Sequence, residues 1–305
     1  MRRDDEEGSM EMQVTQVVES DRQRLLSALP VEECRIERGG ISTAVLEGGE
    51  GPPLILLHGP GEPALKWLRV IPDLVRTHRV MAPDLPAHGE TEVLEGELDA
   101  DRALDWLAGL IEQTCGRPPT VVAQLLGGGI AARLAAARPG AIGQLVLVDS
   151  FGLARFRPSP RFALELVRFQ ARPSEGSYTR FLRQCSYDLD AVREQMGESW
   201  DSFFALNLEF ARSPKAKAAA SLLRTFVRRI PPAELARIAI PTALIWGSQD
   251  RALPVRIAEQ ASSRYGWPLH VVEEAADDPP IDRPDAFLEA LRAALAGGAG
   301  GRARR

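Results

Sequence analysis

The side chains best suited to chemistry in this 305-residue sequence follow segments with the pattern of buried strands. Gln124 ends one such segment, Asp250 ends "PTALIWGSQD", and Asp277 and Asp278 lie in "EEAADDPP" after the last one. Two carboxyl groups held close together cannot both ionise easily, so one of them can keep a proton near neutral pH. Such a pair can transfer protons, and a nearby glutamine can hydrogen-bond a carbonyl or hydroxyl group.

Alternating strand and helix patterns surround these residues and indicate how they are held. The run "PPLILLHG" at 52–59 is typical of a strand buried on both faces, and "VVAQLLGGGIAARLA" at 121–135 predicts a strand, a sharp turn and a helix. Further strands are expected near 142–150 and 241–250. Because strands that alternate with helices form mostly parallel sheets, we predict an α/β fold with helices on both faces.

The alternation stops over residues 151–230, where the pattern predicts helices alone. This segment holds nine of the ten phenylalanines. We predict a helical cap, whose rings either only pack against one another or also form an apolar lid over a pocket. The predicted core comprises residues 20–150 and 231–296, flanked by a disordered extension at 1–19 and a disordered tail at 297–305.

Five motifs occur in a fixed order along the chain: "LILLHGPG", "RVMAPDLPAHGET", "VVAQLLGGGIAARLA", "PTALIWGSQDRALP" and "DRPDAFLEAL". Together they resemble the α/β-hydrolase superfamily over residues 30–296. The resemblance implies a mostly parallel sheet of eight strands with helices on both faces, and a helical cap inserted after the sixth strand. Members with such a cap include esterases, carbon–carbon bond hydrolases, lyases and cyclases, so the fold alone does not fix the reaction.

The resemblance also implies where a catalytic triad would stand, and two of its three positions are changed. The nucleophile position in the sharp turn is Leu125, whose side chain has no lone pair and cannot be acylated. The histidine position is Asp277, whereas the acid position keeps Asp250. The four histidines of the chain fall elsewhere, at His58, His78, His88 and His270. Hydrolysis by a Ser-His-Asp triad is therefore not expected.

Two backbone N–H groups would form the oxyanion hole of such an enzyme. The resemblance assigns one to Pro60, which has no N–H, and the other to the residue after the nucleophile, Leu126. His58, Gly59 and Pro60 are expected to line the pocket. Losing one donor of this kind costs a working acyl-transfer enzyme ~10²–10³ in rate, which again disfavours ester hydrolysis.

Two functions fit these replacements. In the first, Asp277, assisted by Asp250 and Gln124, is the acid/base group of a non-hydrolytic cyclase, lyase, dehydratase or isomerase, which acts without a cofactor on an apolar small molecule. In the second, the chain is a non-catalytic pseudo-hydrolase that binds a small molecule or serves as an interaction subunit. The first requires Asp277 to face the pocket near Asp250. The alternative is that Asp277 and Asp278 are solvent-facing loop residues.

Composition limits the partners and the compartment. The net charge of −5, without a dense basic block, argues against a nucleic-acid partner. The three cysteines are far apart, which indicates a reducing compartment and no disulfide framework or zinc site. No signal peptide and no apolar run of ~20 residues is found, so we expect a cytoplasmic protein without membrane contact. Neither a metal nor a cofactor is expected, and the oligomeric state is left open.

Overall fold

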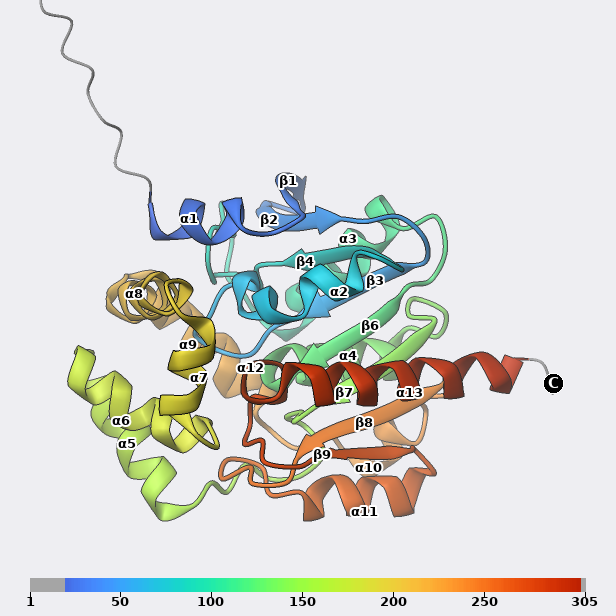
Figure 1. The fold of residues 1–305 in the computed structure, drawn as a ribbon. Helices are drawn as coiled ribbons and strands as arrows, with labels where there is room; N and C mark the ends of the chain where they lie inside the picture. Colours follow the sequence, from blue (N-terminus) through green and yellow to red (C-terminus); the bar gives the residue numbers. More distant parts are fainter. Residues whose placement is uncertain (1–19, 303–305) are drawn as a thin grey trace, which may run out of the picture.

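A nine-stranded sheet forms the centre of this computed structural model, which describes residues 20–302 (Figure 1). The strands are β1 (Glu32–Arg38), β2 (Ile41–Gly48), β3 (Pro53–Leu57), β4 (Arg79–Pro83), β5 (Glu92–Val93), β6 (Thr120–Gln124), β7 (Gln144–Val148), β8 (Thr242–Gly247) and β9 (Leu269–Val272). Eight of them follow the order β1-β2-β4-β3-β6-β7-β8-β9, and the two-residue β5 pairs with β2.

The pairing confirms the predicted mostly parallel sheet. All pairs from β4 to β9 along that order are parallel, whereas β1, β4 and β5 each pair antiparallel with β2. The ninth strand was not expected, because two residues are too few for an alternating pattern. The number of strands implied by the resemblance, eight, matches the order β1-β2-β4-β3-β6-β7-β8-β9, which leaves out β5.

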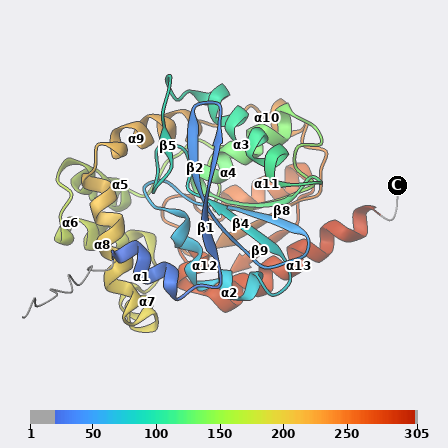
Figure 2. The same ribbon diagram turned by 90° about the horizontal axis from the view of Figure 1, so that it is seen from above.

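Helices cover both faces of the sheet. The view in Figure 2 shows α3, α4, α10 and α11 on one side and α2, α12 and α13 on the other. The bounds of the core helices are α1 (Asp21–Ser27), the 3-10 helix η1 (Ala64–Arg69), α2 (Ile71–Leu74), α3 (Ala100–Thr114), α4 (Leu125–Ala137), α10 (Pro232–Leu235), α11 (Arg256–Tyr265), α12 (Pro279–Asp282) and α13 (Pro284–Arg302).

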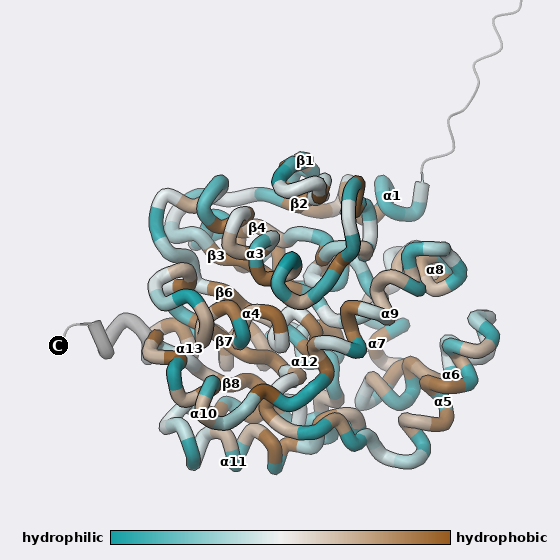
Figure 3. The backbone as a smooth tube through the Cα atoms, turned by 180° about the vertical axis from the view of Figure 1, so that it is seen from behind, coloured by the Kyte–Doolittle hydropathy of each residue, from teal (hydrophilic) through white to brown (hydrophobic). Residues whose placement is uncertain are grey.

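Alternate side chains of each central strand supply two separate hydrophobic cores, because successive residues of a strand point to opposite faces. In β3, Ile55 and Leu57 join the core beneath α3 and α4, and Leu54 and Leu56 join the core beneath α2 and α13. Strands buried on both faces read as continuous apolar runs, and the tube in Figure 3 is accordingly brown along the centre of the sheet.

Five helices occupy the chain between β7 and β8: α5 (Pro160–Ala171), α6 (Glu175–Cys185), α7 (Leu189–Met196), α8 (Ser199–Arg212) and α9 (Lys215–Phe226). They lie beyond the ends to which the arrows of β6 and β8 point (Figure 1). Many of their rings contact one another; Tyr178, for example, lies 4.9 Å from Phe169 and 4.8 Å from Phe204 between ring centroids. We call these five helices the cap.

Helix α13 extends beyond the C-terminal boundary predicted for the core. Disorder was predicted from residue 297, whereas α13 continues to Arg302; residues 303–305 and the predicted extension at 1–19 lie outside the described range. Each glycine lowers helix stability by ~1 kcal/mol relative to alanine. A helix already formed on buried Leu288 and Leu291 nevertheless gains one hydrogen bond for each residue added.

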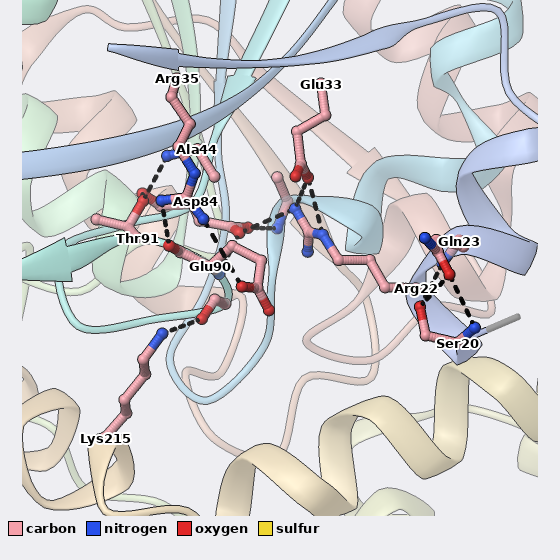
Figure 4. Close-up of polar contacts among 12 residues, drawn as sticks. Ser20, Arg22, Gln23, Glu33, Arg35, Ala44, Asp84, Glu90, Thr91 and Lys215 are labelled. Carbon is pink, nitrogen blue, oxygen red and sulfur yellow. Dashed lines mark hydrogen bonds and ion pairs between the residues drawn. The ribbon is translucent and has the colours of Figure 1, made fainter. Parts of the chain in front are cut away.

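A polar network ties α1 and the cap to the loop after β4 (Figure 4). Arg22 of α1 is buried and contacts both Glu33 and Asp84, with 3.1 Å between its Nη2 and the Asp84 carboxylate. Asp84 also accepts a 2.8 Å hydrogen bond from the Glu90 N–H. Lys215, at the start of α9, donates to the Gly89 carbonyl of the same loop. The loop therefore anchors the cap to the sheet.

Candidate functional site

The sharp turn predicted after β6 is present. β6 ends at Gln124, α4 begins at Leu125, and Leu125 has a φ of 43°. This left-handed conformation costs a non-glycine residue about 1–2 kcal/mol. Close packing enforces it, because a Cβ added at Gly127 would lie 2.6 Å from the Cβ of Leu57. The fold thus keeps the elbow while its tip carries an apolar side chain.

The surroundings of Leu125 offer few hydrogen-bond donors. A Cβ on Gly59 would lie 3.1 Å from Leu125 Cδ1, so the leucine fills the space above this loop. Gly59 donates its N–H to Glu62 Oε1 at 3.2 Å, and Pro60 has none to give. The amide of Leu126, in the first turn of α4, is the remaining donor of the expected oxyanion hole.

Three buried carboxyl groups meet beyond the ends of β7, β8 and β9. We call Asp149, Asp250 and Asp277 the carboxyl cluster. Asp277 is 5% exposed, and its Oδ1 has no hydrogen-bond partner among the described residues. Burial raises its pKa well above the usual value, and the charges of Asp250 and Asp278 add to this effect. Asp277 therefore faces the interior near Asp250, which rules out the solvent-facing alternative.

Asp250 and Asp149 interact directly within the cluster. Asp250 Oδ1 accepts hydrogen bonds from the N–H groups of Ala252 and Leu253 at 2.6 and 2.7 Å, yet burial still raises its pKa to about 6. Asp149 accepts from the Gly247 N–H at 3.0 Å, and burial followed by the charge of Asp250 raises its pKa. One proton shared between the two carboxyls relieves the repulsion.

Asp149 was not identified from the sequence, although its position gave a signal. It directly follows β7, which lies between β6 and β8 in the sheet. The carboxyl ends of parallel strands meet at one edge, so an aspartate there had to lie near Asp250.

Gln124 holds the loop that carries Asp277. Its Nε2 donates to the backbone carbonyl of Asp277 at 2.7 Å, which joins the end of β6 to the segment after β9. This bond fixes the orientation of the amide, and its Oε1 is left without a partner among the described residues. Gln124 was expected to contact substrate, and the bond makes it a positioning residue with one free acceptor.

A second charged group lies beside the cluster and was also missed by sequence reasoning. The side chain of Lys66, in η1, is 1% exposed and forms ion pairs with Asp278 at 2.7 Å and Glu62 at 3.2 Å. Burial raises the pKa of Glu62 to about 7, while Lys66 opposes that rise. The two carboxylates raise the pKa of Lys66 despite its burial. We call these contacts the Lys66 ion pairs.

The cap closes over both groups through α6. Burial raises the pKa of the Cys185 thiol, and the charges of Asp277 and Asp278 raise it further. The pKa of Tyr178 is likewise raised by burial and then by the charge of Glu62. Cys185, the last residue of α6, therefore lies near the carboxyl cluster, and Tyr178, close to the start of α6, lies near Glu62 of the Lys66 ion pairs.

Sequence comparison agrees with this geometry, because a model of the alpha/beta hydrolase family matches residues 54–290. The chain belongs to the alpha/beta hydrolase family. It is 29% identical over 223 residues to a 2-hydroxymuconate semialdehyde hydrolase of Pseudomonas sp. strain CF600, covering 71% of this chain and 77% of the relative. It is 27% identical over 249 residues to a pimeloyl-[acyl-carrier protein] methyl ester esterase of Methylococcus capsulatus, covering 76% and 89%.

A solved structure has the same fold. The 2-hydroxy-6-oxo-6-phenylhexa-2,4-dienoate hydrolase from Rhodococcus sp. strain RHA1 superposes with a TM-score of 0.75 at 23% identity, covering 87% of this chain and 99% of that one. At this identity the likeness concerns the fold. The relatives are named for hydrolytic reactions, so the side chains at the site must decide what this chain does.

Among residues 20–302, the hydrogen bonds and ring contacts of the four histidines are made outside the carboxyl cluster. His58 is fully buried with its Nδ1 2.7 Å from the Gly59 carbonyl and its Nε2 accepting from the Leu85 N–H at 2.8 Å, and burial lowers its pKa to about 3. It therefore holds the loop that was expected to line the pocket. The ring of His88 stacks on Phe210. His270 lies in β9, and His78 lies beside Thr77.

No group of three or more His, Cys, Asp or Glu side chains within residues 20–302 is arranged to hold a metal ion. No helix in the same range has both the length and the apolar character needed to cross a bilayer.

Proposed function

We propose that this member of the alpha/beta hydrolase family is a cofactor-free acid/base catalyst that does not hydrolyse its substrate. It would act in the cytoplasm on an apolar small molecule, by a reaction of the cyclase, lyase, dehydratase or isomerase type, as found in specialised metabolism. The observation that carries the proposal is Asp277, a buried carboxyl with a free oxygen and a raised pKa, at the position that the sequence resemblance assigns to the base.

The chemistry follows from the environment of Asp277. Its neutral carboxyl can donate a proton to a carbonyl or hydroxyl oxygen of the substrate. The carboxylate that remains is disfavoured by burial and by the charge of Asp250, so it readily takes a proton from a substrate carbon. The Gln124 side chain fixes the loop through its bond to the Asp277 carbonyl. No covalent intermediate is required, which is compatible with Leu125 at the elbow.

A β-keto ester tests this proposal, because one molecule reports both reactions. With ethyl 2-oxocyclohexanecarboxylate in deuterated buffer, we expect faster exchange of the α-proton than in buffer alone, followed by NMR. We expect no release of ethanol above background. Ethanol release at an enzyme-dependent rate would show hydrolysis and refute the proposal.

Serine-directed probes give a second prediction. The wild-type protein is expected not to react with fluorophosphonates, and Leu125→Ser alone is expected to stay unlabelled, because removing the base from a triad costs roughly 10⁶-fold. The double variant Leu125→Ser/Asp277→His is expected to gain labelling at residue 125, measured by intact-mass spectrometry. Labelling of any serine in the wild type would show that the elbow is not the relevant site.

A second candidate, a non-catalytic binder, is favoured by the way Leu125 packs over Gly59. Two surface cavities, of about 190 and 1030 Å³, have no lining residue from the carboxyl cluster. A non-catalytic binder would neither accelerate exchange of the α-proton of the β-keto ester nor release ethanol. The exchange measurement therefore distinguishes the binder from the catalyst.

A further inference from the structure

Charge is distributed very unevenly between the cap and the rest of the chain. Residues 151–230 contain 14 Arg and Lys against 8 Asp and Glu, whereas the whole chain contains 37 against 42. The cap is therefore strongly basic on an acidic protein. The net charge of the whole chain conceals this difference, which is why sequence composition gave no indication of a basic surface.

The excess is concentrated over residues 155–183, which comprise α5, α6 and the segments before and after α5; both helices lie at the left edge of the view in Figure 1. Residues 155–183 contain seven arginines, no lysine and two glutamates. Three of these arginines pair with carboxylates: Arg168 and Arg180 contact Glu165, and Arg183 contacts Asp190. The other four are exposed and form no ion pair with any described residue: Arg155, Arg157, Arg161 and Arg172.

An apolar stripe runs along α5 between these arginines. Leu164 is 48% exposed and Val167 is 61% exposed. Because they are three residues apart on a helix, they share one face, and Arg161, three residues before Leu164, lies on the same face; Arg155 and Arg157 precede α5, and Arg172 directly follows its last residue. We call these two apolar residues and the four unpaired arginines the α5 face.

A small recess opens next to the α5 face. It has a volume of about 190 Å³, and its lining includes three arginines, Arg161, Arg183 and Arg251, together with one acidic residue, Asp188. Arg251 is held in place by the backbone carbonyls of Gln184 and Ser186, to which its Nη1 donates at 3.1 and 2.8 Å. Arg183 already pairs with Asp190, so the recess offers two guanidinium groups without an ion pair among the described residues, Arg161 and the positioned Arg251, and such groups match the geometry of a carboxylate.

We propose that the α5 face is the docking surface for an acidic protein partner. Carboxylates of the partner would pair with the four free arginines, one acidic side chain would enter the recess, and a small apolar contact would cover Leu164 and Val167. Unpaired arginines around exposed apolar side chains give an interface both its electrostatic attraction and its buried centre. This partner is independent of the reaction proposed for Asp277.

Two features favour a protein over an anionic bilayer. Helices that lie in a membrane interface expose aromatic rings and leucines on their apolar face. The rings of α5 point inward instead: Phe169 stacks on Phe181 at 5.6 Å and Phe162 meets Phe181 at 5.4 Å between centroids. In addition, every cation of residues 155–183 is an arginine, the residue that binds carboxylates through two parallel hydrogen bonds.

The test measures binding of a fluorescent, Glu-rich helical peptide with two leucines on one face, by anisotropy on the full chain. Vesicles of phosphatidylglycerol and phosphatidylcholine serve as the second probe. The variant Arg157→Gln/Arg161→Gln/Arg172→Gln removes three charges from the α5 face. The control Arg224→Gln/Arg228→Gln/Arg229→Gln removes three exposed charges elsewhere in the 151–230 segment.

We expect the wild type to bind the peptide and the first variant to bind about tenfold more weakly, since each exposed ion pair contributes ~0.5 kcal/mol. The control should stay within about twofold, and Leu164→Ser should also weaken binding. Absence of peptide binding, or equal weakening in the two triple variants, would overturn the proposal. Binding to vesicles in preference to the peptide would assign the face to a bilayer instead.

Discussion

Asp277→Asn is expected to abolish proton exchange on the β-keto ester while making the protein more stable at neutral pH. An amide of the same shape cannot donate and retake an acidic proton, so the rate should fall ~10²–10⁴-fold. Near neutral pH the substitution removes an ionisable group whose charged form is disfavoured by burial and by the charges of Asp250 and Asp278. Asparagine carries no such charge, so the free energy of unfolding should rise by about 1–3 kcal/mol.

The pH dependence of the stability gained by Asp277→Asn follows from the raised pKa of Asp277. Between the unfolded value of ~3.9 and the higher folded value, the folded state binds more protons than the unfolded state, so wild-type stability falls as pH rises. Asparagine does not titrate. The advantage of the variant should therefore be small at pH 4 and grow towards pH 7, which urea unfolding at several pH values can measure.

The neighbouring residue, Asp278, provides a matched control, because its substitution is expected to change the free energy of unfolding in the opposite direction. Asp278→Asn removes a charge that pairs with buried Lys66 at 2.7 Å, so it should lower the free energy of unfolding by about 1–3 kcal/mol at pH 7. It should leave exchange much closer to the wild-type rate. Equal effects of the two substitutions on exchange would show that Asp277 has no special role.

Lys66→Met is expected to lower the free energy of unfolding by about 3–5 kcal/mol at pH 8. The lysine is 1% exposed and is the cation that neutralises Glu62 and Asp278. Methionine fills a similar volume but leaves both carboxylates without a positive partner. In the wild type, burial raises the pKa of Glu62 to about 7 although Lys66 opposes that rise, so the lysine stabilises a charged Glu62 at pH 8 but faces a largely neutral Glu62 at pH 5.5. The loss should therefore be smaller at pH 5.5.

Arg38→Met is the control for Lys66→Met. Arg38 pairs with Glu112 at 2.8 Å, but both side chains are about half exposed or more, at 49% and 66%. Water screens such a pair, so the expected loss is below about 1 kcal/mol at either pH. A loss from Lys66→Met as small as this would mean that the Lys66 ion pairs are open to solvent.

Most of the fold was predictable because residues close together in the sequence determine most of its strands and helices. The continuous apolar runs of β3 and β6 and the small residues around Leu125 identified the buried strands and the elbow. β5 and the end of α13 were not predictable, since one is too short for a pattern and the other depends on packing of the preceding turns.

The candidate site was predictable only in part, for a reason of distance along the chain. Asp250 and Asp277 could be placed through motifs that precede or follow them. Lys66 has no such motif, and its burial depends on Glu62 and Asp278, of which the second is more than two hundred residues away. Nothing in its local sequence distinguishes it from a surface lysine, which is the usual fate of this residue type.

The hydrogen bond from Gln124 to the Asp277 carbonyl joins residues 153 positions apart, and this has a consequence for synthesis on the ribosome. β6, β7 and the cap emerge well before Asp250 and Asp277. The central strands can pair early, while Asp149 still faces water and carries its charge at no cost. Only when the last tenth of the chain leaves the exit tunnel can the carboxyl groups be enclosed together. The unfavourable part of the structure is thus assembled last, when most of the stabilising contacts already exist.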